Sequence, residues 1–420
     1  MDDQKVSQTQ NPLWTRDFTI LTLGTVVSML GCSLAFFAMD LMVLDYTGST
    51  LLFAVYSMVF MLPNAISPVL AGPLLDRFSR KRTIYTLDFI SAGLFAAVAA
   101  IMHFGQFSFF LLAVVNFLLG AINGIYGVAY DSFYPLLISE GNFQKAYSVA
   151  STLETLSAVM VPISAFIYNT FGIVPLISAN AAAFFIAAVM ETQIKAQERY
   201  IRKNDAAAAE REGIRRFTAD FREGLQYLSV EKGLLAITLY FTVSSLTGGM
   251  TGVVTLPYFR KTFPNGEYVY MLVWGMNSLA RFIGGLIHYN LKLPVRWKYG
   301  IALFVYIAIS VLEGVYLFIP VPFMMVTAFL YGMLGITSYN IRASSTQQYV
   351  PDEKKGRFNG AFGTLCTIGA FAGQGLAGAM SAFIGERAIV VIANALCLAA
   401  AAFIIGGAGK EVAKIYNREV

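Results

Sequence analysis

Residues 72–82 read Gly72-Pro-Leu-Leu-Asp76-Arg77-Phe-Ser-Arg80-Lys81-Arg82 and lie between two long apolar runs. A glycine allows two membrane helices to approach closely, and a carboxylate is favourable at the N-terminus of a neighbouring helix. The basic residues can bind anionic lipid headgroups. An ordinary loop that only sets topology would explain the basic residues but not the spacing of Gly72 and Asp76. We therefore predict that this segment acts as a clasp between two halves of the protein. It would hold together the ends of the halves on the inner side of the membrane, and release them when the protein changes conformation.

The composition of the whole chain is that of a membrane protein. Of its 420 residues, 57% are hydrophobic and 13% are charged, and the mean hydropathy is +0.62. A soluble domain carries roughly a quarter charged residues, so a water-soluble enzyme is excluded. The apolar runs are long and unbroken, which excludes an outer-membrane barrel. We predict an all-α polytopic membrane protein.

The apolar runs predict the positions of the membrane helices. Because a crossing needs about 20 apolar residues, the chain has room for twelve, which we place at 18–43, 51–74, 83–103, 107–130, 148–168, 173–192, 233–258, 267–289, 299–319, 322–344, 358–383 and 387–408. A weak internal repeat supports a division into six plus six. The expected organisation is an N-terminus (1–16), a six-helix bundle (17–192), a linker (193–232), a second six-helix bundle (233–408) and a tail (409–420).

The charge distribution predicts the orientation. With the N-terminus inside, twenty-five of the 30 Lys and Arg residues fall on the cytoplasmic side, where basic residues of short loops concentrate. The outer loops hold only Arg260, Lys261 and Arg387. Residues 1–16 lack the features of a signal peptide. We expect a multi-pass protein of the cell (inner) membrane with both termini in the cytoplasm.

Several other kinds of chemistry are disfavoured. Cys32, Cys366 and Cys397 stand alone in apolar runs, and His103 and His288 lie at helix ends, so neither a metal site nor a cofactor is indicated. The basic segments fit topology better than nucleic-acid binding. The glycines of residues 373–378 lie within an apolar helix and predict helix packing rather than nucleotide binding. Residues 409–411 lack the Ser or Thr of a phosphate-binding loop, so ATP is not the expected energy source.

The linker contains an amphipathic pattern. Its apolar stripe predicts a helix at the inner interface, which we interpret as a brace between the halves more readily than as a lipid sensor; the stripe consists of Ile214, Phe217, Phe221, Leu225 and Leu228.

The 72–82 loop resembles the signature of the major facilitator superfamily, G-x-x-x-D-R-x-x-R-[KR]-[KR]. The rest of the chain is similar to the branch that contains macrolide-efflux and enterobactin-exporter-like antiporters, through Asp45-Tyr-Thr-Gly48-Ser49, Pro135-Leu-Leu, Gly224-Leu-Gln-Tyr-Leu228 and Val350-Pro351-Asp352-Glu353-Lys-Lys-Gly356-Arg357. The resemblance implies twelve helices in two six-helix bundles, working as a monomer. It assigns conformational gating to the 72–82 loop, through Gly72, Asp76, Arg77, Arg80, Lys81 and Arg82, and to Asp88 in the third helix.

Two departures from the family pattern bear on coupling. The fifth helix reads Met160-Val161-Pro162-Ile163-Ser164-Ala165, which keeps the proline of the antiporter signature and loses its glycines. Asn116 stands where many drug:proton antiporters carry an arginine in the fourth helix. The first departure weakens the inference of antiport, and the second argues against a proton relay through an arginine at that position.

Ionisable residues inside the membrane are candidates for function because they are costly to insert. Asp40, in the outer third of the first helix, could exchange a proton or bind a cationic substrate; alternatively, it is a hydrated carboxylate at the helix end. Glu154 and Asp131 are candidates for coupling, with Arg281 and Arg342 as possible partners or as members of structural pairs. Glu313 lies on a helix that is peripheral in the family fold and is expected to be a packing feature.

We expect a secondary transporter that works by alternating access, not an enzyme. The resemblance favours proton-coupled export of a small amphipathic organic molecule, such as a drug or hydrophobic metabolite. The alternatives are uptake or facilitated transport of a nutrient, metal chelate or lysolipid, and a non-transporting sensor of the same fold. The expected partners are the small-molecule substrate, protons and membrane lipids.

Overall fold

A computed structural model describes residues 12–75, 78–139, 142–196, 198, 218–219, 221–290 and 293–418. Within these ranges the chain is helical and contains no strand. The chain divides into two compact units, and each is described by itself below. Unit 1 comprises residues 1–42 and 62–213, and unit 2 comprises residues 43–61 and 214–420.

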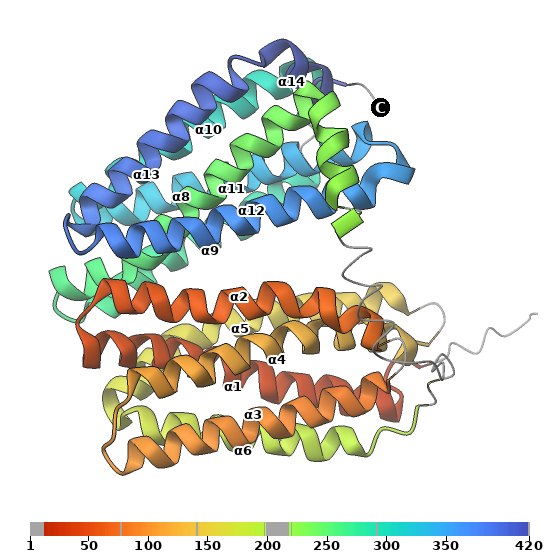
Figure 1. The fold of residues 1–420 in the computed structure, drawn as a ribbon, viewed down its shortest axis with the longest axis vertical. Helices are drawn as coiled ribbons and strands as arrows, with labels where there is room; N and C mark the ends of the chain where they lie inside the picture. The colour runs from red at the N-terminus through yellow and green to blue at the C-terminus, as the bar shows by residue number, and fades with distance from the viewer. Residues whose placement is uncertain are drawn as a thin grey trace, which may run out of the picture. The chain divides into compact units, whose positions relative to one another are not determined.

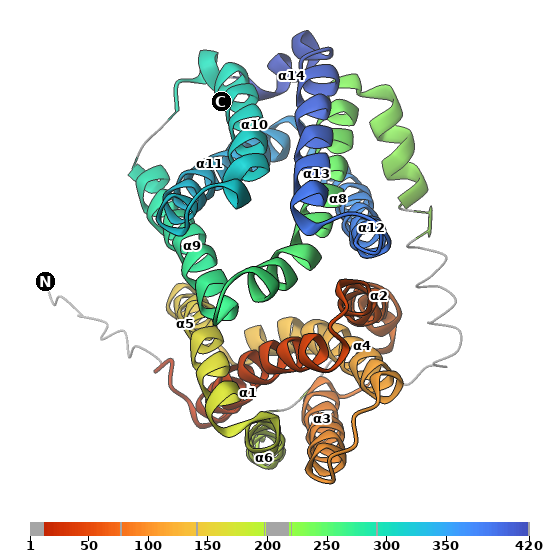
Figure 2. The same cartoon turned by 90° about the vertical axis from the view of Figure 1, so that its left-hand side faces the viewer.

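The first six helices belong wholly or largely to unit 1 (Figure 1), and they are α1 (Arg16–Thr47), α2 (Thr50–Leu75), α3 (Arg80–His103), α4 (Phe109–Phe133), α5 (Phe143–Phe171) and α6 (Ile173–Thr192). α3 and α6 lie side by side in both views (Figure 2). Local sequence sets several of the boundaries. The Ser79 hydroxyl accepts a hydrogen bond from the Arg82 amide at the start of α3, as expected of an N-cap serine. Gly172, with a φ of 81°, separates α5 from α6.

Unit 2 contains the remaining helices, which are α8 (Lys232–Thr262), α9 (Gly266–Asn290), α10 (Lys298–Val315), α11 (Val321–Tyr349), α12 (Asp352–Met380), α13 (Glu386–Ala400) and α14 (Gly409–Tyr416). Short turns of 3₁₀ helix lie at Val295–Trp297 and Tyr316–Phe318, and a π-helical turn (Ala401–Ile405) extends α13. Pro320 and Pro351 directly precede α11 and α12, positions at which a proline breaks the preceding segment without costing the next helix a hydrogen bond.

Glycines make the close contact between α8 and α12. A Cβ atom at Gly373 would lie 1.9 Å from the Leu246 carbonyl oxygen, and one at Gly369 would lie 2.5 Å from that of Thr242. The helices therefore approach closely at positions where only glycine fits, as in other membrane helix pairs. The prediction that residues 373–378 serve helix packing is confirmed.

All twelve predicted segments coincide with helices. In the part of the chain that the structure describes, nine helices are long and apolar enough to cross a membrane. α5, α9 and α12 are not among these nine, and α12 begins with the charged residues of 352–357. The chain is thus a multi-pass helical membrane protein, and the number of crossings remains a prediction.

The linker helix packs on unit 2. Residues 221–230 are helical, and Leu228 is buried in the core that α8, α10, α12 and α14 share. A Cβ at Gly224 would lie 2.5 Å from the Arg357 carbonyl oxygen of α12. Leu225 is exposed, because Gly224 marks the face that packs on α12 and the next residue points about 100° away from it; the placement of this helix at the membrane interface remains a prediction. Ile214 and Phe217 lie outside the described residues.

Candidate functional site

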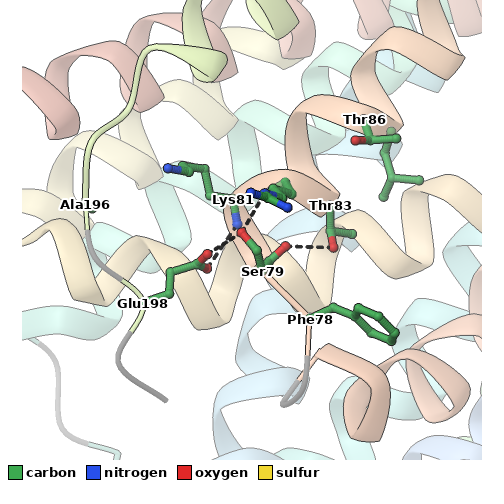
Figure 3. A pocket seen from close by; sticks show the side chains of 9 residues that line it. Phe78, Ser79, Lys81, Thr83, Thr86, Ala196 and Glu198 are labelled. Carbon is green, nitrogen blue, oxygen red and sulfur yellow. Dashed lines mark hydrogen bonds between the residues drawn. The ribbon is translucent and has the colours of Figure 1, made fainter. Parts of the chain in front are cut away.

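The end of the 72–82 loop closes onto the chain after α6. Ser79 donates its hydroxyl hydrogen bond to the Glu198 carboxylate, and the Lys81 amide donates to Glu198 Oε1 at 3.2 Å. Figure 3 shows Glu198 next to these two residues, and all three line a cavity of about 670 Å³. The carboxylate therefore lies at the N-terminus of α3, where the partial positive charge of the helix favours it.

Two basic side chains fix the same loop to neighbouring helices. Arg80 Nη1 donates to the Ser132 carbonyl oxygen at the end of α4, at 3.0 Å. Lys81 Nζ donates to the Ile194 carbonyl oxygen just after α6, at 3.0 Å. The side chain of Arg82 is exposed. This end of α3 is thus tied to both α4 and the segment that follows α6.

The predicted gating residues divide into three groups. Arg80, Lys81 and Arg82 form the first turn of α3 rather than a loop, whereas Asp76 and Arg77 fall outside the described residues, and the surroundings of Gly72 are likewise not described. Asp88 is not part of the loop, because it lies in the third turn of α3 and is 1% exposed. The sequence analysis missed Glu198, since nothing in its local pattern marks it as the partner of Ser79.

Unit 2 contains a cavity of about 580 Å³ among α8, α9, α10, α11 and α12. Its wall combines aromatic rings with hydroxyl and charged groups, and includes Phe241, Tyr270, Trp274, Tyr316, Tyr331, Ser244, Ser245, Thr251, Glu313, Arg281 and Arg342. Small-molecule sites occupy roughly 300–1,000 Å³ and pair apolar walls with a few polar groups. By size and lining, this cavity can hold an amphipathic organic molecule.

Three charged side chains line the cavity from different helices. The guanidinium carbon of Arg342 lies 4.8 Å from the ring centre of Phe362, 5.2 Å from that of Tyr339 and 5.4 Å from that of Phe241. Glu313 of α10 shares the wall with Thr251 of α8, whose hydroxyl donates to the Gly248 carbonyl oxygen at 3.3 Å. Arg281 extends from α9 over Gly335 of α11, where a Cβ atom would meet Arg281 Nη1 at 3.0 Å.

The cavity brings together some of the predicted candidates and leaves others apart. Arg281 and Arg342 share its wall with Glu313, which we had expected to be a packing feature. Asp40 and Asp131 lie in unit 1, where Asp40 is half-buried and Asp131 is exposed at the end of α4. Glu154 is within α5, but its side chain lies outside the described residues. The roles of all these residues remain predictions.

A cluster of ion pairs lies at the end of unit 2 that we expect to face outward. Arg260 Nη2 lies 2.7 Å from Asp45 Oδ1, and Arg260 Nε lies 3.6 Å from Glu267 Oε2. Lys261 Nζ lies 2.5 Å from Glu386 Oε1, which also accepts a hydrogen bond from the Thr50 hydroxyl at 3.0 Å. Residues 43–61 are thereby tied to α8 and α13, and α8 is tied in turn to α9.

A comparison with known proteins identifies the family of the chain. Residues 21–374 match the Major Facilitator Superfamily. The chain belongs to this superfamily. Membership of this superfamily indicates a transporter rather than an enzyme. It also agrees with the major facilitator fold predicted above and with the membrane-spanning helices of the structure.

The relatives within the superfamily are distant in sequence. The chain is 25% identical over 254 residues to the "Uncharacterized MFS-type transporter YkuC" of Bacillus subtilis, covering 59% of this chain and 57% of the relative. It is 21% identical over 280 residues to "Macrolide efflux protein A" of Streptococcus pyogenes, covering 65% of this chain and 66% of the relative. The matches thus span less than two thirds of the length of these relatives.

Solved structures share the fold across nearly the whole chain. An auto-inhibited peptide transporter of the POT family is 13% identical with a TM-score of 0.67, covering 97% of this chain and 98% of that one. A bacterial homologue of the iron transporter ferroportin is 14% identical with a TM-score of 0.65, covering 93% and 98%. At these identities the likeness concerns the fold alone.

Proposed function

We propose that this chain exports amphipathic organic molecules in exchange for protons, by alternating access. The observation that carries the proposal is the cavity of unit 2, whose aromatic wall contains one carboxylate and two guanidinium groups. Aromatic rings provide a large apolar contact area, and a few charged groups orient the bound molecule. A membrane-spanning transporter with such a cavity is suited to substrates that carry both an apolar body and a charged or polar group.

The charged groups of the cavity suggest how a substrate binds. Glu313 can pair with a cationic amine, while Arg342, held among three rings, completes a surface onto which a planar or apolar segment can stack. The relative from Streptococcus pyogenes is named for macrolide efflux, which supports a macrolide as the first compound to test.

Proton coupling requires a carboxyl group that changes its charge inside the membrane. Asp40 is half-buried in α1, and no hydrogen bond or ion pair joins it to another residue of the described ranges. It remains the sequence-derived candidate for coupling, with Glu154 and Asp131 as further candidates. Because no ATP site is expected, a proton gradient supplies the energy.

The orientation and setting complete the proposal. The 72–82 loop lies in the cytoplasm, both termini are cytoplasmic, and the protein works as a monomer in the inner membrane. The ties from Arg80, Lys81 and Glu198 hold the loop in one arrangement, and they exchange partners when the transporter changes state.

Transport into inverted membrane vesicles tests the function. We expect a radiolabelled macrolide to accumulate when the vesicle interior is acidic and to leak out when a protonophore is added. Asp40→Asn should abolish the dependence on the pH gradient. Asp352→Asn is the matched control: its side chain is highly exposed at the start of α12, and Lys355 lowers the pKa of Asp352, so that the carboxylate is charged throughout.

The outcomes separate the parts of the proposal. Accumulation that is the same with and without the gradient would contradict proton coupling. Uptake in right-side-out vesicles would contradict export and favour the nutrient or lipid alternatives. Binding of a compound without any flux in reconstituted vesicles would instead favour a sensor.

A further inference from the structure

Two acidic side chains in the interior of unit 1 take no part in the sites described above. Asp88 lies in the third turn of α3, and Glu191 lies in the last turn of α6. They are 1% and 0% exposed, and their carboxyl groups are within hydrogen-bonding reach of each other. α3 and α6 lie side by side (Figure 1), so the pair lies in the interface between these two helices.

A glycine on α1 makes room for the Glu191 carboxyl group. A Cβ atom at Gly24 would lie 3.0 Å from Glu191 Oε1 and 3.5 Å from its Cδ. The carboxyl group thus rests against the backbone of α1, in the space that a larger residue would fill. This position is set by three helices, α1, α3 and α6.

The oxygens around the pair lack ordinary partners. Within the described chain, both Glu191 oxygens and Asp88 Oδ2 are buried without a hydrogen bond to any other group. The Thr25 hydroxyl is 9% exposed and comes within reach of the Tyr126 hydroxyl of α4, but the two form no well-aligned hydrogen bond. Buried oxygens without donors are costly, so a group that can donate to them is expected here.

No basic side chain compensates the pair. On the neighbouring helices, the titratable groups that interact electrostatically with the pair are Cys32 on α1 and Tyr126 and Tyr130 on α4. Thiol and phenol groups are ordinarily neutral at pH 7. No Lys or Arg in the described ranges acts on either carboxyl group. Two carboxylates in contact in a dry interior repel each other strongly and cannot both remain charged without a proton or a metal ion.

A proton satisfies this arrangement better than a metal ion. The described residues place no third His, Cys, Asp or Glu with the pair, whereas Ca²⁺ or Mg²⁺ takes six or more oxygen ligands and Zn²⁺ about four. A single proton supplies the hydrogen-bond donor between the carboxyl groups and removes one of the two charges. We propose that Asp88 and Glu191 form a proton-binding site in which the two carboxyl groups share one exchangeable proton.

A cavity begins close to the pair along α3. Thr86 and Leu87, the two residues that precede Asp88, line the cavity that Figure 3 shows, and Asp88 itself is buried beside it. If the transporter is driven by protons, as proposed above, this pair binds a coupling proton in addition to Asp40; the existence of the site does not depend on that role.

Infrared difference spectroscopy of the purified, reconstituted protein tests the site without any substrate. We expect a carbonyl band of a protonated carboxyl group that disappears as the pH is raised. Asp88→Asn and Glu191→Gln should each remove this band, because a shared proton needs both carboxyl groups. In each variant, the new side-chain amide can donate to the remaining carboxylate the hydrogen bond that the shared proton otherwise provides. Both variants should therefore fold. Asp352→Asn should leave the band unchanged.

A band that survives in both variants, or the lack of any pH-dependent band, would overturn the site. Displacement of the band by Na⁺ at constant pH would overturn it in favour of a metal-cation site. Gly24→Ala, which keeps both carboxyl groups but intrudes on Glu191, should shift the pH at which the band disappears; an unchanged pH would also count against the proposed geometry.

Transport then decides the coupling role separately. In inverted vesicles, Asp88→Asn and Glu191→Gln should lose gradient-driven accumulation while retaining exchange of labelled for unlabelled macrolide. Full gradient-driven accumulation in both variants would overturn the coupling role. A wild-type protein that ignores the gradient would refute the proposed function, and the infrared result would still decide whether the site exists.

Discussion

The hydroxyl groups of Tyr306 and Tyr416 join α10 to α14 inside the core of unit 2. They lie 2.9 Å apart, and both residues are 0% exposed. Burial raises the pKa of Tyr416 well above its ordinary value, with a further contribution from the neighbouring tyrosine. The pair therefore stabilises the fold only while Tyr416 keeps its proton.

The first prediction concerns this pair at high pH. Because the pKa of Tyr416 is higher in the folded than in the unfolded chain, where it is about 10, its contribution is complete below that pH and is lost as the pH rises through the folded value. Thermal unfolding followed from pH 8 to 11 should show stability falling above about pH 10. Tyr416→Phe should lower stability at pH 8 by about 1–3 kcal/mol, since it leaves the Tyr306 hydroxyl without its partner. A wild-type stability that is flat across this range would contradict the prediction.

Glu313 provides the second prediction. If its carboxylate pairs with a cationic substrate in the cavity of unit 2, Glu313→Gln should weaken binding of a cationic macrolide by about tenfold or more, the loss expected for one charge-assisted hydrogen bond. An uncharged compound of similar size should bind equally well to both proteins, as measured by calorimetry. Equal weakening for both compounds would indicate that the substitution damages the cavity itself.

At the scale of single residues, the sequence predicted which residues are charged within the membrane but not which of them meet. Asp40, Arg281 and Arg342 could be selected because they interrupt apolar runs. Glu191 and Glu198 could not, because both lie near the end of a predicted helix, where a charged residue is ordinary. Their interaction with residues of α3 depends on how α3 and α6 pack, and no local pattern records that contact.

At the scale of helices, the contact between α8 and α12 gives the third prediction. Gly373→Ala would place a methyl group against the Leu246 carbonyl oxygen, so the helices must separate, at a cost of about 1–3 kcal/mol for an overpacked site. Gly363→Ala on the same helix is the matched control, because a Cβ there meets nothing within 4 Å. Thermal unfolding in detergent should show a lower midpoint for Gly373→Ala alone, and equal midpoints for the two variants would contradict the close approach.

Helix positions followed from hydropathy, whereas several helix ends did not. α1 continues to Thr47, α5 begins at Phe143 and α12 begins at Asp352, each several residues outside the predicted apolar run. These extensions are polar, so a hydropathy pattern does not register them even though the backbone hydrogen bonds continue. Likewise, the linker stripe included Leu225 because helical periodicity alone does not show that Gly224 makes the contact with α12.

At the scale of the whole molecule, the fourth prediction concerns topology. Gly105, between α3 and α4, and Arg296, between α9 and α10, are both exposed. In a variant in which Cys32, Cys366 and Cys397 are replaced by serine, Gly105→Cys should react with a membrane-impermeant thiol reagent in intact cells. Arg296→Cys should react only after the cells are opened. The reverse pattern would invert the proposed orientation and place the 72–82 loop outside.

The division of the chain into units does not coincide with the ends of its helices. The boundaries after Met42 and Met61 fall within α1 and α2, whose outer segments belong to unit 2 through contacts such as that of Asp45 with Arg260. Any change in the relative position of the two units must therefore flex these two helices or break the ion pairs. Pro63 lies two residues beyond the second boundary, and a proline removes one hydrogen bond from the interior of a helix and lowers the cost of a kink there. If the two units move relative to each other during the proposed transport, we therefore expect α2 to bend near Pro63, and Pro63→Ala should slow gradient-driven uptake and labelled-for-unlabelled exchange of macrolide in inverted vesicles to the same degree.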